Sequence, residues 1–126
     1  MNLDKVVAGF FIILAMTLNF GFWYGDPLDM NMHSKYVLFA TIVVNLIASV
    51  LKLGDKTQIG SVLIATSLVA VLQLLAAATI WTIFSSDTVL IDAAHFGVII
   101  SLSAGALLAN VTSVILYVGD TLKSKR

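Results

Sequence analysis

The stretch from residue 57 to residue 86, TQIGSVLIATSLVAVLQLLAAATIWTIFSS, contains no Asp, Glu, Lys or Arg. Its apolar residues follow one another directly instead of alternating with polar ones, so the pattern favours a helix over a barrel strand. A bilayer core of about 30 Å is crossed by roughly 20 apolar helical residues. The stretch therefore predicts a helix that spans a membrane.

Three further charge-free runs accompany this stretch, and the four runs together hold 93 of the 126 residues. The other three cover residues 6–25, 36–51 and 93–119. We therefore predict an all-α membrane protein, a bundle of four transmembrane helices that form a single domain over residues 1–126 and sit in a lipid bilayer. The helices are expected at about 6–24, 35–52, 59–84 and 93–118.

The composition excludes several classes of protein. The chain is 60% hydrophobic and 11% charged, with a mean hydropathy of +1.03, so a soluble fold would expose far too much apolar surface. The absence of Cys excludes disulfides, thiolate metal sites and Cys nucleophiles. Lys35 and Lys52, at the ends of the second helix, are expected to snorkel to the interfaces, which leaves His95 as the one ionisable residue within a span.

The sequence lacks the motifs typical of catalytic, phosphate-binding and zinc-binding sites. The sequence has no phosphate-binding loop, no zinc pattern and no Ser-His-Asp set, so we expect no enzyme activity, no cofactor, no metal site and no nucleic-acid partner. Proton-coupled transporters and rotor proteolipids need a titrating group such as a carboxylate within the membrane, and no predicted span contains one. Met and His side chains in the loop at residues 26–33 could bind Cu(I), but a polar turn is the interpretation we favour.

Basic residues divide unevenly between the two sides of the predicted bundle. With a cytoplasmic N-terminus, six of them lie on the inner side, and the outer side carries only Lys35. The six are Lys5, Lys52, Lys56, Lys123, Lys125 and Arg126. The positive-inside rule therefore predicts that both termini are cytoplasmic.

The outer side of the same arrangement carries four carboxylates in its two loops. They are Asp26, Asp29, Asp87 and Asp92. An acidic outer face would concentrate cations. Asp92 is also placed where it could cap the N-terminus of the fourth helix, so capping accounts for part of this acidity.

The second and fourth helices resemble each other at an offset of 65 residues. Residues 40–55 read ATIVVNLIASVLKLGD, and residues 105–120 read GALLANVTSVILYVGD. The shared spacing Asn-x8-Gly-Asp predicts that Asn45 and Asn110 lie at equal depth near mid-membrane and that each Gly-Asp pair ends a helix at the inner face. A tandem duplication of a two-helix hairpin would explain the match, and coincidence in a biased composition is the alternative.

Small residues recur every four positions along the fourth predicted helix. They are Gly97, Ser101, Gly105, Ala109 and Ser113. Such stripes allow helix backbones to approach closely in lipid, where apolar burial does not drive association. A four-residue repeat drifts by about 40° per step, so the five positions cannot all face one partner. Packing within the monomer and self-association both remain open.

Four side-chain amides fall within the predicted spans. They are Asn19, Asn45, Gln73 and Asn110. Each amide needs a partner in hydrocarbon, and hydrogen bonding between helices is the expectation. The alternative is that the amides line a wet path.

Two segments resemble a known family. The opening MNLDKVVAGFF and the segment KLGDKTQIGS at residues 52–61 are similar to an uncharacterised family of short four-span bacterial inner-membrane proteins. The resemblance covers most of the chain. It implies the fold and a multi-pass location in the cell inner membrane, and it implies no activity, ligand or site residue.

The sequence as a whole favours a non-enzymatic assembly or accessory subunit. Such a subunit would bind itself, as a homo-oligomer, or a larger membrane protein, and ion transport is the expected setting. The alternative is a homo-oligomeric cation channel, with Asn45 and Asn110 lining the pore and the outer Asp residues at its mouth. Amides that bond to different neighbours favour a subunit, whereas amides gathered on one face favour a pore.

Overall fold

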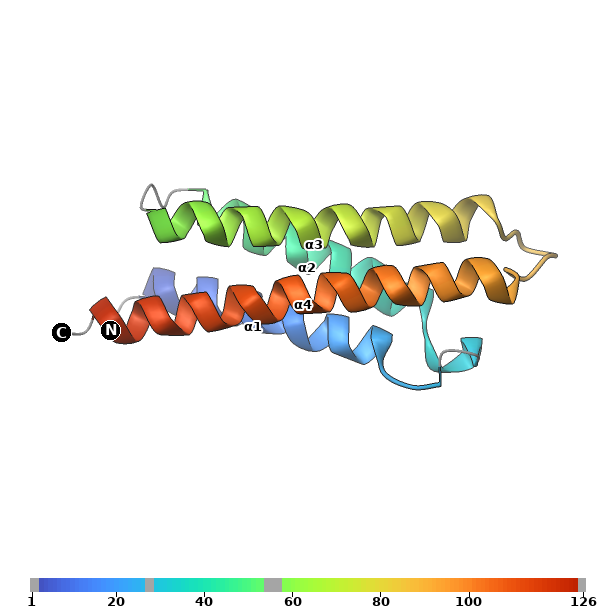
Figure 1. Cartoon of the computed structure of the whole chain (residues 1–126), viewed down its shortest axis with the longest axis horizontal. Coiled ribbons are helices and arrows are strands. Elements are labelled where there is room, and N and C mark those ends of the chain that lie inside the picture. The colour runs from blue at the N-terminus through green and yellow to red at the C-terminus, as the bar shows by residue number, and fades with distance from the viewer. Residues whose placement is uncertain (1–2, 27–28, 54–57, 125–126) are drawn as a thin grey trace.

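The computed structural model describes residues 3–26, 29–53 and 58–124. Within these residues the chain forms four long α-helices, one short 3-10 helix and no strand (Figure 1). The elements are α1 (Leu3–Trp23), η1 (Met30–Met32), α2 (Lys35–Lys52), α3 (Gln58–Ile83) and α4 (Ala93–Ser124). Each α-helix is long and apolar enough to cross a membrane, so the predicted all-α, four-span architecture is confirmed.

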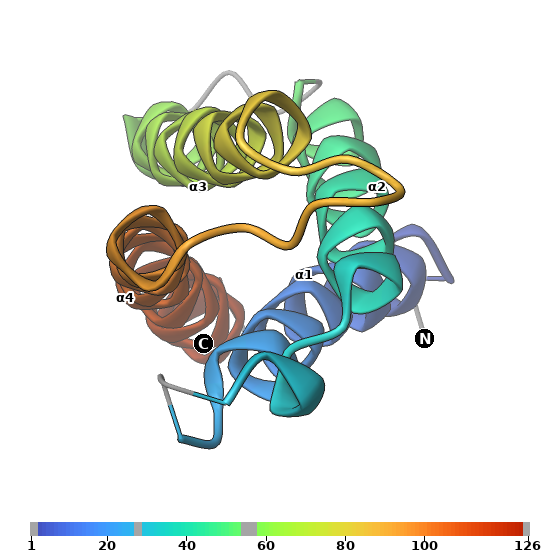
Figure 2. The same cartoon turned by 90° about the vertical axis from the view of Figure 1, so that its right-hand side faces the viewer.

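The four helices pack as a ring. α1 and α3 each pack against both α2 and α4, and the association of α3 with α4 is the most extensive (Figure 2). Both ends of the chain lie at one end of the bundle, which we call the termini end (Figure 1). The connections from α1 to α2 and from α3 to α4 lie at the opposite end, the loop end.

The C-terminal part of α4 is longer than the sequence predicted. We expected its Gly-Asp pair to end the helix, and this is wrong, because α4 continues through Gly119 and Asp120 to Ser124. Glycine permits a left-handed cap without imposing one, and Gly119 does not adopt a positive φ. The matching pair in the second helix, Gly54 and Asp55, lies outside the described residues.

A tyrosine joins α4 to α1 at the termini end. The hydroxyl of Tyr117 donates to the backbone carbonyl of Lys5 at 2.6 Å. The ring lies against Gly9, where an added Cβ would come within 3.2 Å of Tyr117 Cε2. Glycine at this position therefore lets the aromatic ring approach the α1 backbone closely.

The apolar core lies in the half of the bundle nearer the loop end. Phe22, Leu74, Phe96 and Ile99 are each at most 1% exposed and belong to one cluster. Lipid chains are as apolar as these side chains, so in a membrane the cluster stabilises the bundle through close van der Waals packing instead of through removal of surface from water.

A buried histidine closes this core. His33 is 1% exposed and packs its ring against Phe22 and Phe96, with centroid distances of 5.9 and 5.5 Å. Its Nδ1 lies 2.6 Å from the carbonyl oxygen of Phe22, and its Nε2 lies 2.9 Å from that of Asp26. Carbonyl oxygens only accept, so the ring donates to one of them through the nitrogen that carries the proton. The ring thereby ties the end of α1 to the first loop.

We predict that His33→Phe lowers the free energy of unfolding by about 1–3 kcal/mol. Phenylalanine keeps an aromatic ring in the core but cannot donate, so the carbonyl that accepts from the histidine ring loses its partner. Denaturation of the purified protein in mild detergent measures the effect, with Tyr36→Phe, on an exposed tyrosine of the same region, as the control. Equal stability of the two variants would contradict the assignment.

Candidate functional site

A buried lysine contacts hydroxyl groups near the termini end. Lys52 is 6% exposed, and its Nζ donates to Ser67 Oγ at 2.5 Å and to Ser113 Oγ at 3.4 Å. The Ser113 hydroxyl also bonds that of Thr66 at 2.5 Å. One ammonium thus connects three helices, α2, α3 and α4. We call these four residues the Lys52 cluster.

The expectation that Lys52 snorkels to the interface is therefore wrong. Ser67 lies nine residues inside α3, about 13 Å along the helix axis at 1.5 Å per residue. The ammonium turns toward this level because Ser67 and Ser113 offer hydroxyl acceptors there, which offset part of the cost of burying a charge. The sequence carried no signal for the cluster, because the serines stand far from Lys52 in the chain and hydroxyls are common in spans.

Two of the four predicted amides meet between α1 and α4. Asn19 and Asn110 are 0% and 3% exposed. The Asn19 oxygen accepts from Asn110 Nδ2 and from the backbone amide of Leu107, and its nitrogen donates to the carbonyl of Ser103, each at 3.0 Å. The Asn19 side chain therefore bonds directly to the backbone of α4.

The other two amides behave differently. Asn45 is 1% exposed, and its Nδ2 donates to the carbonyl of Thr41 in its own helix at 2.8 Å. The Oε1 atom of Gln73 is buried and has no hydrogen-bond partner within the described residues. Although the repeat aligns Asn45 with Asn110, the two side chains bond to different groups, one within α2 and one on α1.

The small-residue stripe on α4 divides into two halves. An added Cβ at Gly105 would lie 2.7 Å from Gln73 Nε2 on α3, and Ser113 is buried in the Lys52 cluster. Gly97 has open space where a Cβ would stand, and Ser101 is exposed. Ala109, between Gly105 and Ser113, packs partly buried against the core. The inner half of the stripe is used within the monomer, and the outer half, Gly97 and Ser101, faces away from it.

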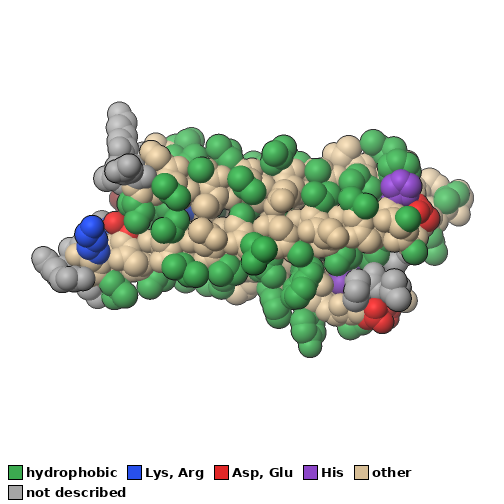
Figure 3. Space-filling model, viewed as in Figure 1, with side chains coloured by type: hydrophobic (Ala, Val, Ile, Leu, Met, Phe, Trp, Pro, Cys, Tyr) green, Lys and Arg blue, Asp and Glu red, His purple; other side chains and the backbone are tan. Residues whose placement is uncertain are grey.

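The four predicted acidic residues lie on two separate connections, two between α1 and α2 and two between α3 and α4. Figure 3 shows acidic side chains at two places of the loop end. Asp29 accepts from the backbone amide of Asn31 at 3.0 Å. Asp92 caps α4, accepting from the backbone amide of His95 at 3.3 Å and lying 2.5 Å from the His95 ring nitrogen Nδ1. Asp26 and Asp87 are exposed. No three His, Asp or Glu side chains within the described part of the chain lie close enough to hold a metal ion.

The Asp92 cap is sensitive to protonation. The hydrogen bond from the His95 side chain lowers the pKa of the Asp92 carboxyl. A carboxyl whose pKa is lowered on folding stabilises the fold above its unfolded pKa, and this contribution is lost as the pH falls through the lowered value. The cap at the start of α4 is therefore complete near neutral pH.

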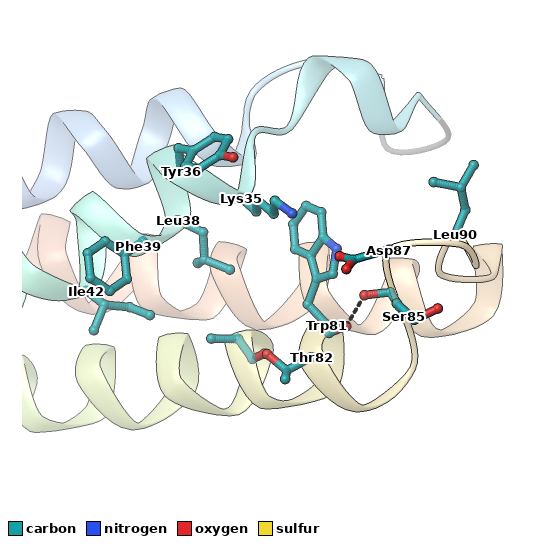
Figure 4. A pocket seen from close by; sticks show the side chains of 12 residues that line it. Lys35, Tyr36, Leu38, Phe39, Ile42, Trp81, Thr82, Ser85, Asp87 and Leu90 are labelled. Atoms are coloured by element: carbon teal, nitrogen blue, oxygen red, sulfur yellow. Dashed lines mark hydrogen bonds between the residues drawn. The ribbon is translucent and has the colours of Figure 1, made fainter.

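An open groove of about 820 Å³ lies between α2 and α3 at the loop end (Figure 4). Leu38, Phe39 and Trp81 contribute to its apolar wall, and Lys35 and Asp87 lie at its mouth. The sequence predicts only that Lys35 reaches the membrane interface and that Asp87 belongs to an acidic outer face. The groove could not be found from the sequence because it depends on how the ends of two helices diverge.

A model of a family of unknown function, DUF6394, matches residues 32–121, most of the chain. The chain belongs to this family. Membership of DUF6394 agrees with the predicted resemblance to an uncharacterised family. No curated protein and no solved structure matches the chain.

We predict that two leucine substitutions on the α4 stripe differ in their effect on the stability of the monomer. Gly105→Leu forces the Gln73 amide out of its position, which is expected to lower the free energy of unfolding by about 1–3 kcal/mol. Gly97→Leu enters open space and should leave monomer stability unchanged. Denaturation in detergent, with both variants held monomeric by dilution, measures the difference. Equal losses would show that the stripe does not divide as described.

Proposed function

We propose that this DUF6394 protein is a small non-enzymatic subunit of a membrane assembly, which associates with further copies of itself through the outer half of the α4 stripe. A larger membrane protein is the other partner that this surface would accept. The orientation we propose puts the termini end in the cytoplasm and the loop end outside, in the cell inner membrane. Lys5 and Lys123 at the termini end support it, since basic residues favour the cytoplasmic side.

The main support for this proposal is the hydroxyl of Ser101, which lacks a hydrogen-bond partner within the described residues. Exposed hydroxyls elsewhere on the helices, such as those of Thr17, Thr79 and Thr112, donate to carbonyls of their own helices. Ser101 is exposed, and its hydroxyl makes no hydrogen bond within the described residues. A polar group that faces hydrocarbon without a partner is costly, and a neighbouring helix can supply the missing acceptor.

Gly97, one turn from Ser101, supports the same surface. It lacks a side chain, and no neighbouring atom of the described residues lies within 4 Å of the position where its Cβ would stand. A second helix can therefore approach the α4 backbone closely at this level, which brings its carbonyls within reach of the Ser101 hydroxyl. The combination of a close approach and an unsatisfied donor is typical of helix interfaces in membranes.

A cation pore through a single bundle receives less support. The Lys52 ammonium lies buried among α2, α3 and α4, and Asn45 bonds to its own helix. A positive charge inside the bundle would repel cations. The acidic loop end would still attract cations from outside, so ion transport remains the setting that we propose, with any ion path lying in the assembly or in a partner protein.

We predict that a single cysteine at position 101 forms disulfide-linked dimers in native membranes. The chain has no Cys of its own, so Ser101→Cys introduces one reactive group. Oxidation followed by non-reducing electrophoresis measures the dimer, and native mass spectrometry of the wild type gives the copy number. Leu72→Cys, on an exposed position of α3, is the matched control for random collision.

Addition of Gly97→Leu to the Ser101→Cys variant should abolish the cross-link, because a branched side chain would hold the second helix away. Equal cross-linking at positions 72 and 101 would contradict the proposed surface. A monomeric wild type without any bound protein, after gentle extraction, would contradict the assembly role altogether.

A further inference from the structure

The groove between α2 and α3 has an apolar wall and a polar mouth. The wall includes Leu38, Phe39 and Ile42 from α2 and Trp81 from α3. The mouth includes Lys35, the first residue of α2, and Asp87, in the connection that follows α3. In a membrane the wall is therefore at the depth of lipid acyl chains, and the mouth is at the depth of the head groups.

The two charged residues at the mouth do not neutralise each other. Lys35 and Asp87 are both exposed, and neither forms an ion pair with any described residue. The Lys35 ammonium instead lies 5.8 Å from the centroid of the Tyr36 ring. Figure 4 shows the Trp81 ring between the Lys35 and Asp87 side chains. One positive and one negative group thus line the same apolar groove.

We propose that this groove binds one glycerophospholipid whose head group carries a phosphate and a primary ammonium, that is, an ethanolamine phospholipid. The acyl chain lies along Phe39 and Ile42, the phosphate faces Lys35, and the ammonium donates to Asp87. An ammonium group on an apolar chain and an exposed carboxylate complement the two charges of this head group. The proposal does not depend on the assembly role, because the groove lies on α2 and α3 and the assembly surface lies on α4.

The same chemistry distinguishes this lipid from the other common head groups. Choline carries a positive charge but no N–H donor, so it cannot form a charge-assisted hydrogen bond with Asp87. A glycerol head group has no positive charge and leaves the carboxylate next to an anionic phosphate. The groove should therefore prefer ethanolamine over choline lipid and choline over glycerol lipid.

Native mass spectrometry of the full chain in mild detergent tests the proposal. Ethanolamine, choline and glycerol phospholipids with identical acyl chains are titrated separately, and the fraction of protein with one bound lipid is compared. We expect wild-type protein to bind the ethanolamine lipid about threefold to fivefold more tightly than the choline lipid, because only ethanolamine adds a hydrogen bond to Asp87. Equal binding of the three lipids, or tightest binding of the glycerol lipid, would overturn the proposal.

Charge variants test separately the contact of Lys35 with the phosphate and the contact of Asp87 with the ammonium. Asp87→Asn should abolish the preference for ethanolamine over choline, and Lys35→Gln should weaken the binding of both lipids. Lys123→Gln, an exposed lysine at the termini end, is the control and should change neither. Retention of the ethanolamine preference by Asp87→Asn would show that Asp87 does not contact the head group.

A steric variant tests the location. Thr82 is exposed and lines the groove, and its hydroxyl donates to the carbonyl of Ala78 in its own helix. Thr82→Trp should fill the channel and reduce one-to-one lipid binding at least threefold, while the helical content by circular dichroism is unchanged. Undiminished binding by a folded Thr82→Trp variant would place the lipid elsewhere and overturn the proposal.

Discussion

Hydrocarbon offers no hydrogen-bond partner, and this constraint determines where most polar side chains of the bundle lie. The helices satisfy their own backbones, so the polar side chains must find protein partners. Most exposed hydroxyls bond to the preceding turn of their helix, Asn19 bonds to the backbone of α4, and Lys52 bonds to hydroxyls of α3 and α4. The hydroxyl of Ser101 has no such partner within the described residues, which is why we propose that a second helix packs against α4 there.

The two ends of the bundle are held together by different contacts. Near the loop end, aromatic rings pack around His33, whose two ring nitrogens lie within hydrogen-bond distance of the carbonyl oxygens of Phe22 and Asp26. Toward the termini end, Lys52 and its hydroxyls connect α2, α3 and α4, and Tyr117 connects α4 to α1. The loop end has a groove with charged residues at its mouth. At the termini end the Lys52 contacts are buried, and the hydrogen bond of Tyr117 is exposed.

The spans could be predicted because a bilayer requires long charge-free runs, and such runs are visible without any knowledge of packing. The division of the α4 stripe also follows from its four-residue period, although which half faces inward depends on where Gln73 lies. The inward turn of Lys52 could not be predicted, because the direction of a flexible side chain depends on hydroxyls that only the assembled bundle brings opposite it. The continuation of α4 through Gly119 was missed because glycine allows a helix end without requiring one.

In the proposed orientation, the four helices cross a membrane and both chain ends lie on the cytoplasmic side. Single cysteines at Ser86, in the second loop, and at Ser124, at the end of α4, can be labelled with a membrane-impermeant thiol reagent in sealed inner-membrane vesicles of known orientation. We predict that position 86 reacts only from outside and position 124 only from the cytoplasmic side. Labelling of both positions from the same side would contradict this orientation.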